Sequence, residues 1–251
     1  MSVVPGLKSL VYYMGYVPIV AVFSISGFTF GLLLPHRQRQ NLLTLANALI
    51  VRWLCFTCSI KLEVSGIENI PSTPFVALSK HQSSWETYFL QRTLRPVSTI
   101  LKKELLRIPV FGWGLAMTKP IAIDRANPRS ALRDILSQGK ARLAEGNNVL
   151  LYPEGTRVPV GEAGKYGRSG TALAIAAQVP VLPIAHNAGS CWPAHKFLKL
   201  PGTIRVVIGK PLSTENADSK QLTAEVQTWI EATIAAMPAA MPRHSEAQAE
   251  K

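Results

Sequence analysis

A histidine and a carboxylate at close spacing are the residues of this chain best suited to proton transfer. Four residues separate His81 from Glu86. A histidine that is oriented by a carboxylate can take a proton from an alcohol near neutral pH. On one regular helix the two side chains would lie about 140° apart, because five steps turn the chain by about 500°. They can meet if His81 lies in a turn and Glu86 lies in the first turn of a helix.

The same segment also has a purely structural interpretation. Ser83 and Glu86 match a capping box, in which both side chains bond to the backbone at the start of a helix. Ser83 or Ser84 is a natural N-cap residue for that helix. The two interpretations are compatible, because both place Glu86 in the first helical turn. An apolar candidate strand, 75–79, directly precedes His81, and open α/β sheets bind ligands outside the carboxyl ends of their strands.

A second polar group follows the candidate strand 149–152, where the chain reads Pro-Glu-Gly-Thr-Arg. Gly155 permits a tight or left-handed turn. Thr156 supplies a hydroxyl, and Arg157 supplies a guanidinium fork that suits a phosphate. Glu154 is expected to form an ion pair with Arg157 and to hold it in place. An ordinary surface turn is the alternative for such a segment.

Further basic residues lie near the ends of other candidate strands. Lys103 and Arg125 each follow such a strand, and Arg125 is expected to join Arg157 around one phosphate. Lys165 and Arg168 would add positive charge to the same region. The alternative is that these residues are ordinary solvated charges on the surface.

The elements that must position these residues can be read from the apolar pattern. Candidate strands are 61–64, 75–79, 97–101, 121–124, 149–152, 181–185 and 203–208. Candidate helices are 85–93, 128–145, 170–177 and 221–236. The alternation predicts an α/β fold, with a mostly parallel or mixed central sheet flanked by helices.

The N-terminal part of the chain differs from the rest. The run 9–34 carries no formal charge and exceeds the roughly 20 residues that span a hydrocarbon core. It predicts a retained, helical membrane anchor rather than a cleaved signal peptide. A second apolar stretch, 41–60, contains one charge, Arg52, and is either an interfacial helix or a helix packed on the domain. The predicted organisation is a leader (1–60), an α/β domain (61–237) and a disordered tail (238–251).

Composition restricts the class of partner. The net charge is +12 and only 17% of residues are charged, so the partners expected are anionic. No acidic residue precedes Glu63, which fits an anionic membrane surface better than nucleic acid. No nucleic-acid motif, P-loop or dinucleotide fingerprint is present in the sequence. Arg37 and Arg39 after the first apolar run favour a cytoplasmic location for the C-terminal side of that run.

The three cysteines predict neither a disulfide framework nor a metal site. Cys55 and Cys58 have the spacing of a zinc-binding pair, but a site would need two more ligands. Cys191 and His195 are the candidates for them, and no pattern brings the four together. We therefore predict that no metal is bound.

Four blocks of the sequence resemble the motifs of the glycerolipid acyltransferase family. These are His-x4-Asp, a basic block ending in Asp-Arg, Pro-Glu-Gly-Thr-Arg and Val-Pro-Val-x-Pro, which correspond to 81–86, 102–125, 153–157 and 179–183. Together they span roughly residues 75–185. One position departs from the family, because Glu86 stands where the family has aspartate, with one methylene more.

The resemblance implies acyl transfer from a thioester, acyl-CoA or acyl carrier protein, to the free sn-2 hydroxyl of 1-acylglycerol 3-phosphate. The product would be phosphatidic acid, and no cofactor beyond the acyl donor is implied. His81 would be the general base, oriented by Glu86. Arg157, with Thr156 and Arg125, would hold the acceptor phosphate. The other residues expected at the substrate are Lys103, Glu154 and Gly155.

The resemblance also implies a membrane-bound enzyme, located in a bacterial inner membrane with its catalytic domain on the cytoplasmic face. Phe111 and Trp113 are candidates for the wall of an acyl pocket. The absence of a Gly-x-Ser-x-Gly motif in the sequence argues against a serine acyl-enzyme. Two alternatives remain: transfer to another lysolipid, such as a lyso-ornithine lipid, or a non-catalytic membrane protein that binds lipid.

Overall fold

A computed structural model describes residues 3–240 of the chain. Seven strands form one sheet in the order β1-β7-β6-β2-β5-β3-β4. Their bounds are β1 Ile60–Ser65, β2 Val76–Ser79, β3 Val97–Lys102, β4 Ile121–Ile123, β5 Asn148–Leu151, β6 Val181–His186 and β7 Gly202–Ile208. Neighbouring strands pair in parallel except β6 and β7, which are antiparallel. All seven predicted strands are found, and the expected mixed sheet is confirmed.

Seven α-helices accompany the sheet within the described range. They are α1 Val3–Thr29, α2 His36–Cys58, α3 Trp85–Thr93, α4 Phe111–Ala116, α5 Pro128–Ala144, α6 Ser169–Ala177 and α7 Ser219–Ala236. Local chemistry explains where two of them begin. Asn127 caps α5 by accepting the N–H of Ser130, with a proline at the first helical position. Asp218 caps α7 in the same way. The sequence did not predict α4.

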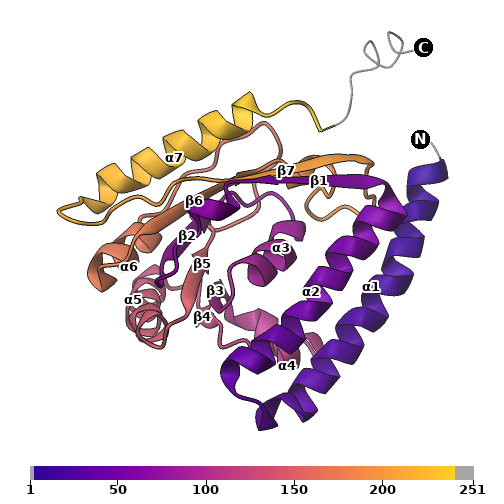
Figure 1. The fold of residues 1–251 in the computed structure, drawn as a ribbon, viewed down its shortest axis with the longest axis horizontal. Helices are drawn as coiled ribbons and strands as arrows, with labels where there is room; N and C mark the ends of the chain where they lie inside the picture. The colour runs from indigo at the N-terminus through magenta and orange to yellow at the C-terminus, as the bar shows by residue number, and fades with distance from the viewer. Residues whose placement is uncertain (1–2, 241–251) are drawn as a thin grey trace.

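Helices cover both faces of the sheet, as Figure 1 shows. Side chains alternate between the faces along each strand. In β2, Ala77 faces a core shared with α1, α2 and α3. Its neighbours Val76 and Leu78 face a second core, shared with α5, α6 and α7. Because both faces are buried, the central strands are continuously apolar, as expected for a sheet of this type.

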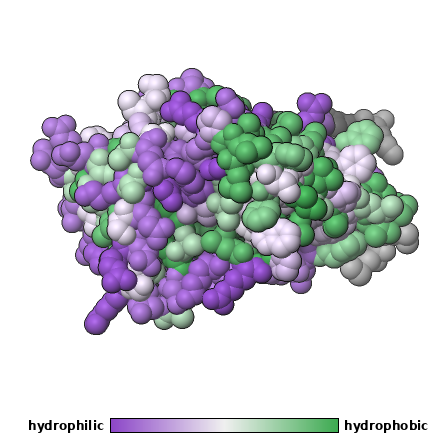
Figure 2. Space-filling view, turned by 90° about the horizontal axis from the view of Figure 1, so that it is seen from below, coloured by the Kyte–Doolittle hydropathy of each residue, from purple (hydrophilic) through white to green (hydrophobic). Residues whose placement is uncertain are grey.

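The two N-terminal helices form a hairpin at one end of the molecule (Figure 1). Both are long and apolar enough to cross a membrane. α2 packs against α3, and half of its most apolar window is buried. In α1 that share is 17%, so its apolar side chains are largely exposed. Figure 2 shows apolar residues gathered over this end of the molecule, with hydrophilic residues over the other end.

The C-terminal residues within the described range return to the sheet. The carbonyl of Ala240 accepts a hydrogen bond from the N–H of Thr203, the residue that pairs with Lys61 of β1, at 2.8 Å. The remainder of the predicted disordered tail, 241–251, lies outside the described residues.

The sheet topology determines where the candidate residues meet. Strands β2, β5, β3 and β4 are neighbours and run parallel, so their carboxyl ends lie at one edge. The segments after these strands carry the polar motif residues. His81 follows β2, Lys103 follows β3, Arg125 follows β4 and Arg157 follows β5. This edge is where open α/β sheets bind ligands.

Candidate active site

The predicted histidine–carboxylate pair is formed. His81 lies in the turn after β2, and Glu86 lies in the first turn of α3. The distance from His81 Nδ1 to Glu86 Oε1 is 2.8 Å. An ionised carboxylate can only accept, so we assign the proton to Nδ1 of His81. This tautomer leaves Nε2 with a free lone pair, which is the form that a general base requires.

The structural role expected of Glu86 is fulfilled by the same carboxylate oxygen. Oε1 also accepts the backbone N–H groups of Gln82 at 3.0 Å and Ser83 at 2.8 Å. Ser83 Oγ in turn accepts the N–H of Trp85 at 3.1 Å. The longer glutamate side chain therefore orders the turn that carries His81 and orients its imidazole ring.

The environment of Glu86 lowers the pKa of its carboxyl group and so favours the ionised form. The side chain is completely buried, and burial on its own would raise its pKa. His186 and His81 outweigh burial, and the N–H of Ser83 acts in the same direction, so the pKa of Glu86 is lowered. Burial also lowers the pKa of His186, whose Nε2 donates to the carbonyl of Lys80 at 2.8 Å.

Contacts from the segment after β5 hold His81 in place. Its ring stacks on Tyr152 with a centroid separation of 4.1 Å and an interplanar angle of 17°. Its N–H donates to Glu154 Oε2 at 2.8 Å, and its carbonyl accepts the N–H of Val158 at 2.8 Å. With both backbone groups bonded and one ring face stacked, His81 is well ordered for catalysis.

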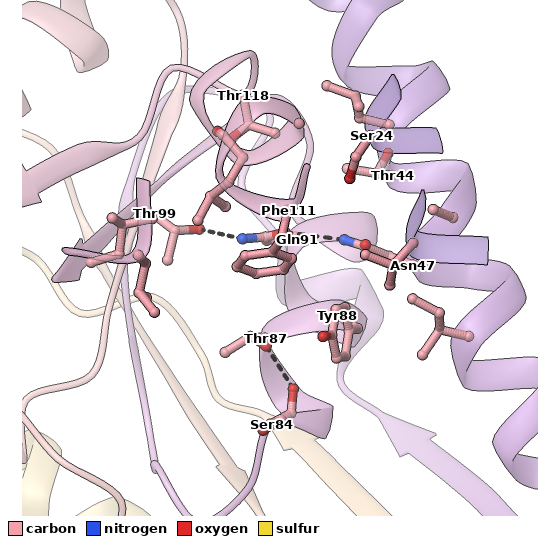
Figure 3. A pocket seen from close by; sticks show the side chains of 18 of the residues that line it. Ser24, Thr44, Asn47, Ser84, Thr87, Tyr88, Gln91, Thr99, Phe111 and Thr118 are labelled. Carbon is pink, nitrogen blue, oxygen red and sulfur yellow. Dashed lines mark hydrogen bonds between the residues drawn. The ribbon is translucent and has the colours of Figure 1, made fainter. Parts of the chain in front are cut away.

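His81 lines a cavity of about 290 Å³. The wall is built by α1, α2, α3, β3 and α4, together with the loops after β2, β4 and β5. Figure 3 shows Gln91 of α3 lying between α2 and β3. It accepts from Asn47 Nδ2 at 3.0 Å and donates to Thr99 Oγ1 at 3.3 Å. The N-terminal hairpin thus forms part of the cavity wall, which the sequence did not indicate.

Two of the predicted phosphate-binding residues line this cavity, Arg125 and Arg157. Arg157 Nε donates to the carbonyl of Ser83 at 3.0 Å, and Arg125 donates to the carbonyl of Gly155. Burial lowers the pKa of Arg125, and the nearby Arg157 acts in the same direction while Glu104 opposes them. Two guanidinium groups that line one cavity are suited by charge and geometry to bind an anion.

The remaining predicted substrate-binding residues lie outside the cavity lining. Gly155 adopts the left-handed conformation expected, with φ of 70°, and Thr156 is exposed beside it. Lys103 pairs with Asp124. None of these three residues lines the cavity, although Gly155 and Thr156 directly precede Arg157 in the chain. Lys165 and Arg168, expected to add charge, are exposed and also absent from the lining.

The expected ion pair between Glu154 and Arg157 is wrong. The Glu154 side chain is completely buried and pairs instead with Lys80 at 2.7 Å. Its other oxygen accepts the N–H of His81, and the carboxylate is absent from the cavity lining. Glu154 therefore supports the loop that carries His81. Nothing in the local sequence indicated a partner 74 residues away.

The two aromatic residues predicted for a pocket wall have different positions. Phe111 lines the cavity and is visible in Figure 3. Trp113 does not line it and is 44% exposed. Its ring packs against Phe28 of α1, with centroids 5.5 Å apart. Trp113 therefore belongs to the contact between α4 and the N-terminal hairpin.

Within residues 3–240, no three His, Cys, Asp or Glu side chains come together as metal ligands. Cys55, Cys58 and Cys191 are all free thiols. The described lining of the cavity combines an oriented histidine, two guanidinium groups and the ammonium group of Lys102 with neutral polar and apolar side chains.

Comparison with known proteins identifies the class of protein in which such a cavity is found. The family model described as Acyltransferase matches residues 61–187. The 1-acyl-sn-glycerol-3-phosphate acyltransferase of Pseudomonas aeruginosa is 44% identical over 239 residues, which cover 94% of this chain and 93% of that protein. The chain belongs to the Acyltransferase family, and it is an enzyme of that class.

More distant relatives extend the likeness. The chloroplastic 1-acyl-sn-glycerol-3-phosphate acyltransferase BAT2 of Brassica napus is 33% identical over 162 residues, covering 63% of this chain and 47% of that protein. The crystal structure of the 1-acyl-sn-glycerophosphate (LPA) acyltransferase of Thermotoga maritima superposes with a TM-score of 0.78. It shares 20% sequence identity and covers 94% of this chain and 97% of that chain. The fold of this chain is therefore similar to that of the Thermotoga protein over most of its length.

Proposed function

We propose that this enzyme transfers a fatty acyl group from a thioester to the sn-2 hydroxyl of 1-acylglycerol 3-phosphate and so makes phosphatidic acid. The observation that carries the proposal is the arrangement of one cavity. An oriented histidine and two arginines line it together with apolar side chains. That combination suits an acceptor that bears a hydroxyl, a phosphate and an acyl chain.

The proposed reaction proceeds by direct attack. His81 Nε2 takes the proton of the acceptor hydroxyl as the hydroxyl oxygen bonds to the thioester carbonyl carbon. The carbon–sulfur bond then breaks, and the thiolate leaves and recovers the proton from the imidazolium. The carboxylate of Glu86 stabilises the imidazolium while it exists. The products are an ester and a free thiol, and no cofactor other than the acyl donor is needed.

The N-terminal hairpin supports a location at a membrane. The exposed apolar side chains of α1 lie on the same hairpin that walls the cavity, so a lipid acceptor would reach His81 from the bilayer. We propose a bacterial inner membrane as the site, with the α/β domain on the cytoplasmic face, where thioester donors are made. The positive charge of the chain is consistent with an anionic lipid surface.

The acceptor and donor can be tested with purified enzyme in detergent or vesicles. Labelled acyl-CoA and acyl carrier protein are each supplied with 1-acylglycerol 3-phosphate, a lyso-ornithine lipid or another lysophospholipid. We expect labelled phosphatidic acid as the principal product. Faster transfer to the lyso-ornithine lipid would identify that lipid, and not 1-acylglycerol 3-phosphate, as the acceptor. Binding of lipid without turnover would indicate a non-catalytic protein. Glycerol 3-phosphate serves as an acceptor without an acyl chain.

Replacing Arg157 by alanine is expected to raise the KM for 1-acylglycerol 3-phosphate by about 10- to 100-fold, because a charge-assisted hydrogen bond contributes about 1.5–3 kcal/mol. The measurement is a saturation curve for this acceptor beside one for an unphosphorylated monoacylglycerol, whose KM should not change. Arg133→Ala removes an exposed arginine of α5 and serves as the control. An unchanged KM for the phosphorylated acceptor in Arg157→Ala would exclude Arg157 from phosphate binding.

A further inference from the structure

The lysine that precedes the general base is buried and fully bonded. The side chain of Lys80 has no exposed surface. An ammonium group has three N–H donors, and Lys80 Nζ has three acceptors. They are Glu154 Oε1 at 2.7 Å, Glu231 Oε1 at 2.8 Å and the carbonyl of Glu162 at 3.0 Å. Each donor of this buried charge is therefore matched, which is the condition under which a buried ammonium is tolerated.

This network continues to the backbone of His81. Glu154 binds Lys80 through one carboxylate oxygen and the N–H of His81 through the other, at 2.8 Å. Since Glu154 is completely buried, its orientation depends on these contacts. The position of the general base therefore depends on the contacts that Lys80 makes.

The third member of the network comes from outside the segment that the family model matches. Glu231 lies on α7, beyond residues 61–187, and its side chain is 24% exposed. Its Oε1 accepts both Lys80 Nζ and the hydroxyl of Tyr166, the latter at 3.0 Å. The C-terminal helix thus supplies a charged partner to the residue next to His81.

We propose that Glu231 is a positioning residue for the transfer reaction. Through Lys80 and Glu154 it holds the backbone of His81 where the imidazole meets Glu86. The inference rests on the proposed function, since it assigns Glu231 to the same site.

The physical reason is the balance of the Lys80 contacts. Without the carboxylate of Glu231, one N–H of a buried ammonium loses its charged acceptor, and Lys80 is attracted to Glu154 alone. A shift of Glu154 toward Lys80 lengthens its bond to the N–H of His81. Misplacement of a catalytic group by about 1 Å can cost on the order of 10²-fold in rate.

The test is Glu231→Gln, which keeps the length of the side chain and one oxygen acceptor but removes the charge. We expect kcat to fall by about 10- to 100-fold. The KM values for both substrates should change by less than about twofold, because the substitution disturbs the group that reacts and leaves substrate binding intact. Tyr166→Phe, which removes only the hydroxyl that orients Glu231, should reduce kcat in the same direction by a smaller factor. Glu225→Gln changes an exposed glutamate of the same helix and should match the wild type.

A second readout separates positioning from loss of fold. The Nδ1–H proton of His81 can be observed by NMR in enzyme with labelled histidine and assigned by its loss in His81→Ala. We expect this resonance to shift in Glu231→Gln and to be unchanged in Glu225→Gln, with all variants measured well below their unfolding temperatures.

Three results can be distinguished. If Glu231→Gln matches Glu225→Gln in kcat and in the His81 resonance, the positioning role is excluded. If kcat falls only in proportion to unfolded protein, with the His81 resonance unmoved, Glu231 is merely structural and the inference is also excluded. If the wild type itself transfers no acyl group to any acceptor, the proposed function fails, whatever the variants show.

Discussion

Replacing His81 by alanine should lower kcat by about 10²- to 10⁴-fold, the range that general base catalysis contributes. The reason is the imidazole Nε2 of His81, since no other histidine lines the cavity among the described residues. The measurement is transfer of a labelled acyl group under saturating donor and acceptor. KM for either substrate should change little, because His81 acts on the reacting hydroxyl and does not hold the phosphate.

The control for His81→Ala must exclude unfolding. Glu86 keeps its two backbone donors when the imidazole is removed, so the turn before α3 should stay formed and the unfolding temperature should remain near that of the wild type. His195→Ala removes an exposed histidine outside the cavity and should leave the rate unchanged. A His81→Ala enzyme that is folded and retains more than about a tenth of the wild-type rate would exclude His81 as the base.

The strands and the contact between His81 and Glu86 could be predicted from sequence because their signals are local. Each strand is a short run that is either mainly apolar or alternates polar with apolar residues. Glu86 had to lie in the first turn of a helix under either interpretation. The segment that became α4 carries no such signal, since Gly112 and Gly114 disfavour a helix. Its conformation is set by packing instead. A side chain at Gly114 would come within 2.7 Å of Ser24 Oγ on α1, so glycine allows the close approach of these helices.

The parts of the site that the sequence did not indicate are those that depend on contacts between distant segments. Glu154 pairs with Lys80, which lies 74 residues before it in the chain. The cavity that His81 lines is walled in part by α1 and α2, which come from the N-terminal end of the chain. From the sequence alone, the expected ion-pair partner of Glu154 is the nearest residue of opposite charge, Arg157. In the fold, the parallel order of β2 and β5 brings Lys80 to Glu154 instead. Strand order of this kind is a property of the whole sheet and has no local signature.

Replacing Glu86 by glutamine should also lower kcat severely, by about 10²- to 10⁴-fold. The amide is nearly the same shape, and its oxygen can still accept from His81, Gln82 and Ser83. What is lost is the negative charge, which stabilises the imidazolium as the proton is transferred. Because the carboxylate is completely buried beside His81, that charge acts with little screening by water. The KM values should again remain close to those of the wild type.

Glu86→Asp separates the charge from its position. The charge remains, but the carboxylate is withdrawn by about one carbon–carbon bond, roughly 1.5 Å. In the wild type, Oε1 of Glu86 accepts hydrogen bonds from His81 Nδ1 and from the backbone N–H groups of Gln82 and Ser83. On this backbone the aspartate cannot reach all three donors, even though aspartate is the residue of the family motif. We expect a kcat between those of the wild type and Glu86→Gln. Full activity in Glu86→Gln would show that the charge of this residue has no part in catalysis and that Glu86 only caps α3, whereas full activity in Glu86→Asp alone would show that the turn adjusts to the shorter side chain.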